Sequence, residues 1–590
     1  MKRLIRLLEH HRLESVLAPL FKMTEALFDL LIPLIMADII NNGIAGGDTA
    51  YLYRRCLLMV LLGAVGLACS VTAQYFAARA AVESCAQVRR SLFDKIQSLG
   101  FAETDALGTS TLITRMTSDV NQVQNGLNLF LRLFLRSPFI VLGAMVMAFT
   151  INVRGALIFA VVIPVLGAAV LAIMLQTIPR YQRVQRLLDR LTGLTRENLT
   201  GVRVVRAFGR EPDEVRRFEQ ADGALLDGQL RVGRLSALMN PLTYVIVNLG
   251  VAAVLQAGAA GVGAGAMAMG DVVALVNYMS QILLEMVKLA NLVVQLTKAI
   301  ACAERIDGVL ALQPQMRFGT ARPDPAASEN AVEFLNVGLA YSPAGGESLS
   351  NITFTAKKGQ TIGIIGGTGS GKTSLVSLIP RYYDATSGQV RLFGRDIREY
   401  DQGSLRRCVS TVLQKAQLFS GTIRSNLLWA DPAAGDAQLW AALETAQAAE
   451  IVRGKALQLD EPVEQGGRNF SGGQKQRLSI ARSLVGRPEI LILDDSSSAL
   501  DYATDAALRR ALHALPPGVT VFLVSQRATS LCHADQILVL DEGRLVGAGR
   551  HDQLLQSCPV YRDIYESQFK RAEPGGIADA RPGLAGEEMA

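Results

Sequence analysis

Six long apolar segments fill most of the first 300 residues, and they limit the possible folds of this chain more than any other feature. Each can supply the roughly 20 residues that a helix needs to cross the hydrocarbon of a bilayer. Helices also satisfy their own backbone hydrogen bonds, which a bilayer requires. Buried helices of a soluble protein are a weak explanation for six such segments in succession. The segments are about 17–40, 56–78, 132–152, 155–178, 241–263 and 271–297.

The connections between these segments are alternately short and long, and the long ones indicate the orientation. Residues 79–131 and 179–240 form the long connections, and the second is rich in arginine. Basic loops remain on the cytosolic side of a membrane. We therefore predict a multi-pass protein of the cytoplasmic (inner) membrane with both long loops and both termini in the cytosol. Apolar residues recur at helical intervals in the loops, which predicts that the membrane helices continue into the cytosol.

Ionisable residues interrupt the first and sixth segments. Lys22, Glu25 and Asp29 share one helix face, as do Glu285 and Lys288. Charges inside a membrane are costly and usually face a cavity or a partner. Glu25, Asp29 and Glu285 are therefore candidates for lining a substrate cavity. A structural ion pair, or a lysine that extends to the interface, explains them equally well.

The chain divides into a membrane part and a soluble part. Half of its residues are hydrophobic, yet 19% are charged, and the charged ones gather outside the apolar segments. We predict a transmembrane domain at 1–302, a linker at 303–330, a soluble α/β domain at 331–570 and a disordered Gly/Pro/Ala-rich tail at 571–590. The net charge of +6 is modest and does not indicate a nucleic acid partner.

The stretch GGTGSGKT fits a phosphate-binding loop between a buried strand and a helix. Its glycines allow successive backbone N–H groups to face a polyphosphate, and the helix N-terminus adds a favourable dipole. The lysine is expected to reach the β- and γ-phosphates, and the threonine hydroxyl to bind Mg²⁺. The expected nucleotide-binding residues of this loop are Gly366, Gly367, Thr368, Gly369, Ser370, Gly371, Lys372 and Thr373.

A second expected anion site lies at the start of a later helix, in the sequence SGGQ. Exposed N–H groups at a helix start bind phosphate. This site cannot easily hold the same phosphate as the first loop from the same side, so a second chain is its natural recipient. Its residues are Ser471, Gly472, Gly473 and Gln474.

Five further residues are placed to act on a bound nucleotide. Tyr341 precedes the phosphate loop by about twenty-five residues, where an aromatic ring can stack on adenine. Asp494 ends a buried apolar strand and is expected to hold Mg²⁺, with Asp495 next to it. Gln414 follows a short apolar stretch and is expected to reach the metal or the attacking water, and Gln526 follows the last buried strand.

Together these motifs, in this order behind six apolar segments, resemble the half-transporter type of ATP-binding cassette (ABC) exporter, over nearly the whole chain. The resemblance implies a dimer that closes over two ATP molecules, each held by one chain's phosphate loop and the other chain's SGGQ. ATP and Mg²⁺ are the implied cofactors. A small-molecule substrate and membrane lipid are the other expected partners, and the implied mechanism is alternating access.

Two residues depart from the pattern of the family. Its members usually carry glutamate after the metal-binding aspartate and histidine after the last strand, whereas this chain has Asp495 and Gln526. We therefore expect impaired hydrolysis at these catalytic positions, and we predict one subunit of a heterodimeric exporter of hydrophobic or amphipathic compounds. Its partner would be a different half-transporter, and hydrolysis would occur mainly at the site that the partner's motifs form. An ATP-gated channel or regulatory membrane protein and a homodimeric lipid or peptide exporter are the alternatives.

Overall fold

The computed structural model describes residues 11–342, 345–496, 498, 500–516 and 518–569. Within them the chain forms two compact units. The first unit is helical and comprises residues up to Ser98 together with Leu107–Leu312. The second comprises Leu99–Ala106 and the chain from Gln313 onward. The tail predicted at 571–590 lies outside the described residues.

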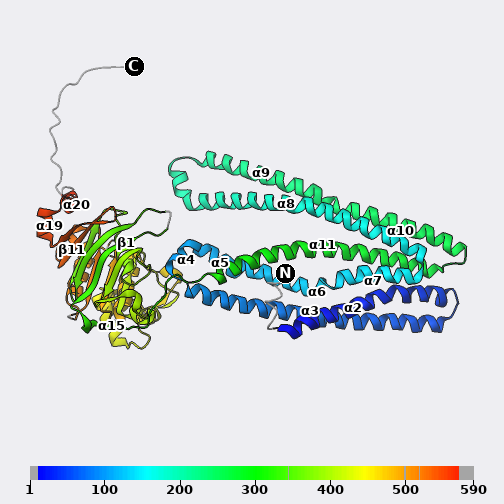
Figure 1. Cartoon of the computed structure of the whole chain (residues 1–590), viewed down its shortest axis with the longest axis horizontal. Helices are drawn as coiled ribbons and strands as arrows, with labels where there is room; N and C mark the ends of the chain where they lie inside the picture. Colours follow the sequence, from blue (N-terminus) through cyan, green and yellow to red (C-terminus); the bar gives the residue numbers. More distant parts are fainter. Residues whose placement is uncertain (1–10, 343–344, 497, 499, 517, 570–590) are drawn as a thin grey trace, which may run out of the picture. The chain divides into compact units, whose positions relative to one another are not determined.

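Long helices form the first unit (Figure 1). Among the residues described in this unit, two short π-helical segments, Ile39–Ile44 and Arg115–Asp119, interrupt the α-helices. The α-helices are α2 (Arg12–Asp38), α3 (Thr49–Ser98), α5 (Thr109–Thr114), α6 (Val120–Leu133), α7 (Arg136–Ile151), α8 (Val153–Ala207), α9 (Glu211–Ala237), α10 (Met239–Gly263) and α11 (Met269–Ala311).

Five stretches of helix among the described residues are long and apolar enough to cross a membrane, and they contain the second to sixth expected segments. The first segment, 17–40, falls largely in α2, which carries Lys22, Glu25 and Asp29 and is not among the five. The helices are also longer than a bilayer requires. The 55 residues of α8 correspond to about 80 Å of helix, so helical structure continues beyond a hydrocarbon layer of about 30 Å.

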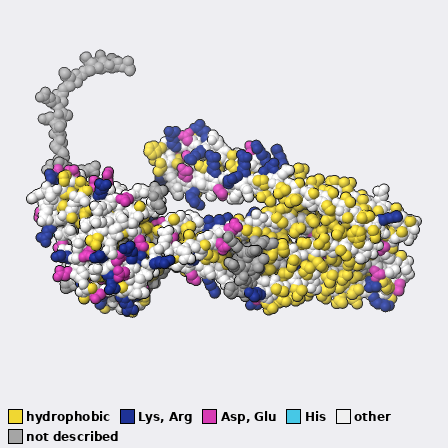
Figure 2. Space-filling model, viewed as in Figure 1, with side chains coloured by type: hydrophobic (Ala, Val, Ile, Leu, Met, Phe, Trp, Pro, Cys, Tyr) yellow, Lys and Arg dark blue, Asp and Glu magenta, His cyan; other side chains and the backbone are white. Residues whose placement is uncertain are grey.

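Side chains on the surface of the helical unit differ along its length. Figure 2 shows hydrophobic side chains over the region where α2, α3, α7 and α10 lie, and Lys and Arg side chains around the connection between α8 and α9. Leu61, Val146 and Leu249 are exposed examples of the first kind. Exposed apolar side chains at this density fit a helical surface that faces lipid, because lipid tails are as apolar as the side chains.

The second unit is built on a mixed sheet of six strands in the order β12-β11-β3-β10-β9-β6. All neighbours in this sheet are parallel except β11 and β12. Its strands are β3 (Thr361–Gly366), β6 (Val409–Val412), β9 (Ile490–Asp494), β10 (Thr520–Val524), β11 (Gln536–Asp541) and β12 (Arg544–Gly549).

An antiparallel sheet and two further short strands complete the β-structure. The antiparallel sheet has the order β2-β1-β4-β5, and β7 pairs with β8. The strands are β1 (Asn330–Leu339), β2 (Leu349–Lys357), β4 (Ser387–Leu392), β5 (Arg395–Asp396), β7 (Gly421–Thr422) and β8 (Pro462–Val463). The α-helices of this unit are α4 (Phe101–Leu107), α12 (Lys372–Leu378), α13 (Gln402–Cys408), α14 (Ile423–Leu427), α15 (Asp436–Thr445), α16 (Ala449–Arg453), α17 (Gly472–Val485), α18 (Tyr502–His513), α19 (His551–Ser557) and α20 (Pro559–Phe569).

The central strands are apolar at every position because both faces of the sheet are covered. In β9, Leu491 and Leu493 belong to one hydrophobic core, and Ile490 and Ile492 belong to the other. Side chains of a strand alternate between the two faces, so a strand buried on both faces needs an unbroken apolar run. This requirement explains the apolar runs that precede the phosphate loop and Asp494. The predicted fold class, a helical membrane domain fused to an α/β nucleotide-binding domain, is confirmed, with the number of spans approximate.

Candidate functional site

The phosphate loop joins the end of β3 to the start of α12 in the second unit. Gly371 has a φ of 94° and immediately precedes α12, a conformation that favours glycine. A Cβ atom at Gly366 would lie 2.1 Å from the carbonyl oxygen of Leu540 on the neighbouring strand. The loop therefore needs glycine at both positions, once for its turn and once for its close approach to β11.

Lys372 is folded along the loop that precedes it. Its Nζ donates hydrogen bonds to the carbonyl oxygens of Gly366 (2.9 Å) and Gly367 (2.6 Å). Burial lowers the pKa of Lys372, and the nearby Asp495 and Asp494 carboxylates oppose that shift. The ammonium is thus held beside the backbone of the phosphate loop.

The carboxyl ends of the parallel strands β3, β10 and β9 lie at one edge of the sheet. This topology brings the phosphate loop close to two acidic residues. Thr373 Oγ1 donates to Asp494 Oδ1 at 3.2 Å. Asp494 is buried, and burial raises the pKa of its carboxyl, whereas the hydrogen bond from Thr373 lowers it. A hydroxyl and a carboxylate are hard oxygen donors, which suit Mg²⁺, so these residues fit the predicted metal ligands.

Asp495 is the point where three of the predicted residues meet. Gln414 Nε2 donates to Asp495 Oδ2 at 3.3 Å, and Gln526 Nε2 donates to the same oxygen at 3.5 Å. Burial raises the pKa of Asp495, and the hydrogen bond from Gln414 is the largest effect that opposes this shift. One carboxylate oxygen is therefore shared by two neutral amide donors.

Tyr341 follows β1, and its side chain is 51% exposed. Its hydroxyl donates to Ser374 Oγ in α12 at 2.9 Å. The ring also meets Tyr383 edge-on, with centroids 5.0 Å apart. Tyr383 in turn donates its hydroxyl to Asp105 Oδ2 of α4 at 2.5 Å. The Tyr341 ring, which is expected to stack on adenine, is thus accessible to a ligand. It contacts Tyr383, and Tyr383 is hydrogen-bonded to α4.

The SGGQ residues form the N-terminus of α17, a helix of 14 residues. Ser471 Oγ accepts from the backbone N–H of Gln474, and Gln474 Oε1 accepts from the N–H of Ser471. Ser471 and Gly472 are exposed, and Gly473 is half-buried. None of the side-chain hydrogen bonds in the described part of the chain joins Ser471–Gln474 to the phosphate loop. The helix start is ordered by its own capping and faces outward.

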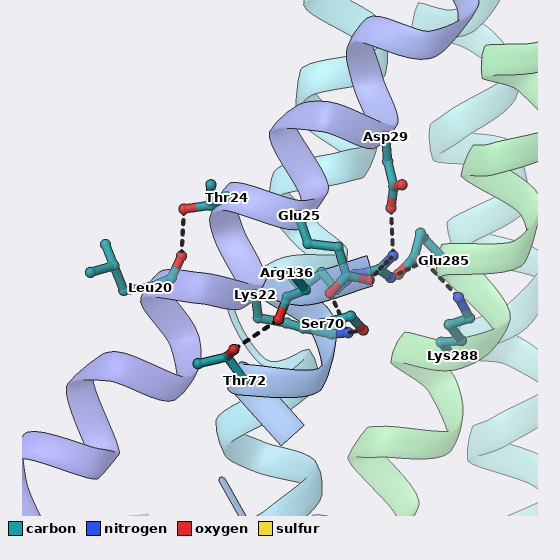
Figure 3. A network of polar contacts seen from close by, with 11 residues as sticks. Leu20, Lys22, Thr24, Glu25, Asp29, Ser70, Thr72, Arg136, Glu285 and Lys288 are labelled. Atoms are coloured by element: carbon teal, nitrogen blue, oxygen red, sulfur yellow. Dashed lines mark hydrogen bonds and ion pairs between the residues drawn. The ribbon is translucent and has the colours of Figure 1, made fainter. Parts of the chain in front are cut away.

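A second cluster of charged side chains joins α2, α7 and α11 in the helical unit (Figure 3). Arg136 donates to Asp29 Oδ2 at 2.9 Å and to Glu285 Oε1 at 2.5 Å, and it lies 3.7 Å from Glu25 Oε1. Ser137 Oγ donates to Glu285 Oε2 at 2.7 Å. Arg136 is 8% exposed and Glu285 is 3% exposed. Arg136 on α7 is therefore surrounded by three carboxylates from two other helices.

Two lysines extend this intramembrane ion network at its ends. Lys22 Nζ pairs with Glu25 Oε2 at 2.5 Å and donates to Ser70 Oγ of α3 at 2.9 Å. Lys288 Nζ pairs with Glu285 Oε1 at 2.8 Å. With Arg136 and the three carboxylates, the network has three basic and three acidic groups and no formal net charge. Each charge thus has a partner of opposite sign inside the network.

The three residues predicted to line a substrate cavity differ in access. The Glu285 side chain is 4% exposed, and both of its oxygens accept hydrogen bonds, which is typical of a structural ion pair. The Glu25 side chain is 13% exposed, and that of Asp29 is 37% exposed. Of the three, Asp29 is the carboxylate that a molecule in a cavity could reach most easily.

Sequence reasoning missed the centre of this network. Arg136 lies inside the third apolar segment, and its charge alone was a readable signal. The hydroxyl partners Ser70 and Ser137 gave no such signal, because serine is common in membrane helices. Tyr383 was missed for a similar reason, since nothing in the sequence separates it from an aromatic core residue.

These two sites and the fold define a membrane protein with a nucleoside-triphosphate-binding domain. Residues 15–286 match the ABC transporter transmembrane region, and residues 349–498 match the ABC transporter domain. A curated relative in Mycobacterium tuberculosis, named as an uncharacterized ABC transporter ATP-binding protein, is 36% identical over 585 residues, 97% of this chain and 100% of the relative. The chain belongs to the ABC transporter family.

Other relatives are named for export or for lipid flipping, and a solved structure matches the fold. A Bacillus subtilis protein whose name assigns it to multidrug export is 30% identical over 97% of this chain and 98% of its own length. The ATP-dependent lipid A-core flippase of Haemophilus ducreyi is 27% identical over 96% and 98% of the two chains. The structure of a bacterial Atm1-family ABC exporter with ATP bound matches the fold with a TM-score of 0.79 over 96% of this chain and 99% of that one, at 23% identity. The chain is an ABC exporter, and its nucleotide-binding domain is of the type that couples ATP hydrolysis to transport.

Proposed function

We propose that this chain is one subunit of a heterodimeric exporter that moves hydrophobic or amphipathic compounds across the cytoplasmic membrane. Two relatives named for multidrug export and for flipping lipid A-core support this class of substrate. The arginines of α8 and α9 support an orientation with these helices, both termini and the nucleotide-binding domain in the cytosol.

The observation that carries the proposal is the environment of Asp495. A catalytic carboxylate must reach the water that attacks the γ-phosphate, and aspartate is one methylene shorter than the glutamate usual in the family. A misplacement of about 1 Å can reduce a rate roughly 10²-fold. Gln526 donates a hydrogen bond to Asp495, but an amide neither takes up a proton nor carries a positive charge. Both departures therefore reduce hydrolysis at the same site.

The chain's own phosphate loop binds ATP in this proposal. Lys372 contacts the phosphates, Tyr341 stacks on the adenine, and Thr373 and Asp494 hold Mg²⁺, which neutralises phosphate charge when it is bound. Gln414, which donates to Asp495 Oδ2, would reach the metal or the attacking water. With Asp495 short and hydrogen-bonded to two amides, this ATP is held and cleaved slowly.

The SGGQ of this chain acts on the other nucleotide. Its helix start is exposed and correctly capped, so it is intact as an anion site. It completes a nucleotide site whose phosphate loop and catalytic residues belong to a different half-transporter. Fast hydrolysis takes place at that composite site.

Purification of the chain by itself tests the proposal. The isolated chain should show little ATPase activity, about 10²-fold or more below that of the complex with its partner. ATPase is measured by phosphate release, and the subunit composition by native mass spectrometry. Brisk ATP hydrolysis by a homodimer of the wild-type chain would overturn the heterodimer and favour a homodimeric exporter instead.

Two variants separate the causes of the low activity. In the isolated chain, Asp495→Glu by itself should restore little ATP hydrolysis while Gln526 remains. Asp495→Glu combined with Gln526→His should restore more. Adding Lys372→Ala to the double variant provides the control, because it removes the phosphate contact.

Transport of a fluorescent amphiphile into inverted vesicles, with the partner present, distinguishes an exporter from an ATP-gated channel, which would give only passive leak.

A further inference from the structure

A cavity of about 270 Å³ opens on the surface of the nucleotide-binding domain, away from the phosphate loop. It lies between α18, the strand β10 and the segment 528–534. Val521 and Leu523 form its apolar floor. Its polar lining is Arg509, Arg510, His513, Ser530, His533 and Thr361, and none of the described residues that line it is acidic.

The basic residues of this cavity divide into one that is paired and three that are not. Arg509 forms an ion pair with the buried Asp505 at 3.2 Å and donates to the Thr529 carbonyl at 3.0 Å. Arg510, His513 and His533 are exposed and have no hydrogen-bond or ion-pair partner in the part of the chain that the structure describes. Three donor side chains without acceptors therefore converge on one cavity, and one of them is a permanent cation.

Nearby acidic groups do not compensate this charge. Asp505 is 2% exposed and accepts from Ser530 Oγ at 3.2 Å in addition to pairing with Arg509. Asp535 accepts a hydrogen bond from the backbone N–H of Thr361 at 2.8 Å, and it does not line the cavity. The guanidinium of Arg510 is thus available to an external anion.

The cavity is separate from the nucleotide site, but two of the chain segments that line it directly follow residues of that site. Thr361 is the first residue of β3, whereas the phosphate loop begins at Gly366, its last residue. The helix α18 follows directly after Asp501, its N-cap, and the segment that contains Ser530 and His533 follows Gln526. A ligand held between these two segments would connect them. Asp505 of α18 already does so, because it pairs with Arg509 and accepts a hydrogen bond from Ser530.

We propose that this cavity binds a small anion with at least two negative charges, a phosphate ester or a polycarboxylate. Guanidinium groups bind phosphate and carboxylate through two parallel hydrogen bonds. The imidazoles of His513 and His533 supply N–H donors from the two walls. The volume is smaller than that of most pockets for drug-sized ligands, which are about 300–1,000 Å³. It therefore fits an anion smaller than a nucleotide, bound independently of ATP.

Isothermal titration of the purified complex with inorganic phosphate and, separately, with citrate tests this site. Both titrations use the Lys372→Ala background, so that the phosphate loop of this chain does not contribute. We expect saturable binding of at least one probe, at least tenfold weaker after Arg510→Gln combined with His533→Gln. Arg406→Gln, which removes an exposed arginine elsewhere in the same domain, should leave the affinity unchanged.

The two probes distinguish the ligand classes. Binding of phosphate but not citrate assigns a phosphate ester, and the reverse assigns a polycarboxylate. Hydrogen exchange should slow at 505–513 and 528–534 when the probe is bound, and not in the double variant. If neither probe binds, or if the double variant binds as tightly as its parent, the proposal is wrong. Retained melting temperature in the double variant shows that loss of binding is not loss of folding.

Discussion

The guanidinium of Arg136 donates to the carboxylate of Glu285 at 2.5 Å, so a buried ion pair joins α7 to α11. The same guanidinium also bonds Asp29 on α2. A charge in an apolar environment is tolerated only with partners, and removal of one partner leaves the others uncompensated. Arg136 therefore has the largest expected influence on how these three helices pack.

Arg136→Met should destabilise the helical unit by about 3–5 kcal/mol, the usual cost of breaking a buried ion pair. The free energy of unfolding in mixed micelles is the measurement. Lys288→Met removes a charge from the exposed end of the same network, where the side chain is 46% exposed, and should have a much smaller effect. Adding Glu285→Met to Arg136→Met should recover part of the loss. Equal effects of Arg136→Met and Lys288→Met would contradict a central role for Arg136.

Tyr383→Phe should weaken transport while ATP binding is retained. The variant loses the hydrogen bond to Asp105 of α4, a contribution of about 0.5–1.5 kcal/mol, but it leaves the ring of Tyr341 untouched. Transport is measured in vesicles, and ATP affinity with a fluorescent analogue. Asp105→Asn keeps an acceptor and should transport normally, whereas Asp105→Ala should behave like Tyr383→Phe. Normal transport by both Tyr383→Phe and Asp105→Ala would show that this contact is not needed.

Asp495→Asn should raise the melting temperature of the nucleotide-free protein at neutral pH. Burial raises the pKa of Asp495 above its usual 3.8, so the ionised carboxylate disfavours the folded state above the folded pKa. The gain should shrink as the pH falls through that pKa, because the carboxyl then becomes neutral in the folded protein. Melting curves of the parent and the variant, recorded from neutral to acidic pH, are the measurement.

Asp501 provides the opposite case for this measurement. It caps α18 by accepting from the N–H of Thr504, a hydrogen bond that lowers the pKa of its carboxyl. Its stabilising effect is present above the unfolded pKa and is lost as the pH falls through the lowered folded pKa. Asp501→Ala should therefore lower the melting temperature at neutral pH. A loss of stability in Asp495→Asn as well would refute the inferred cost of the buried Asp495 charge.

Substitutions at the two anion sites should have unequal effects in the heterodimer. Lys372→Ala should reduce the number of tightly bound ATP molecules from about two to about one and leave most of the hydrolysis. Ser471→Arg should block the partner's site and abolish most of the hydrolysis, whereas Ser471→Thr keeps the helix cap and should retain it. Bound nucleotide and phosphate release are measured on the same samples. Similar losses of hydrolysis from Lys372→Ala and Ser471→Arg would indicate two equivalent sites.

The sequence by itself was sufficient for features that depend on local pattern. An unbroken apolar run predicts a membrane helix or a strand buried on both faces, and glycines before Lys372 and Thr373 predict a phosphate loop. The strands before Gly366 and Asp494 are β3 and β9 as the structure has them. The first apolar segment shows the limit of the pattern: the sequence predicts a membrane span at 17–40, yet with its three charged residues α2 is not among the five helices that are apolar enough by composition.

Only the tertiary structure decided which side chains meet. Gln414, Asp495 and Gln526 are separated by 81 and 31 residues, and parallel pairing of β6, β9 and β10 brings them to one carboxylate oxygen. Arg136 and Glu285 are 149 residues apart and meet through helix packing. Sequence patterns record the environment of each residue along its own helix or strand. Partners across the fold depend on how those elements pack, and that information is not local to any segment.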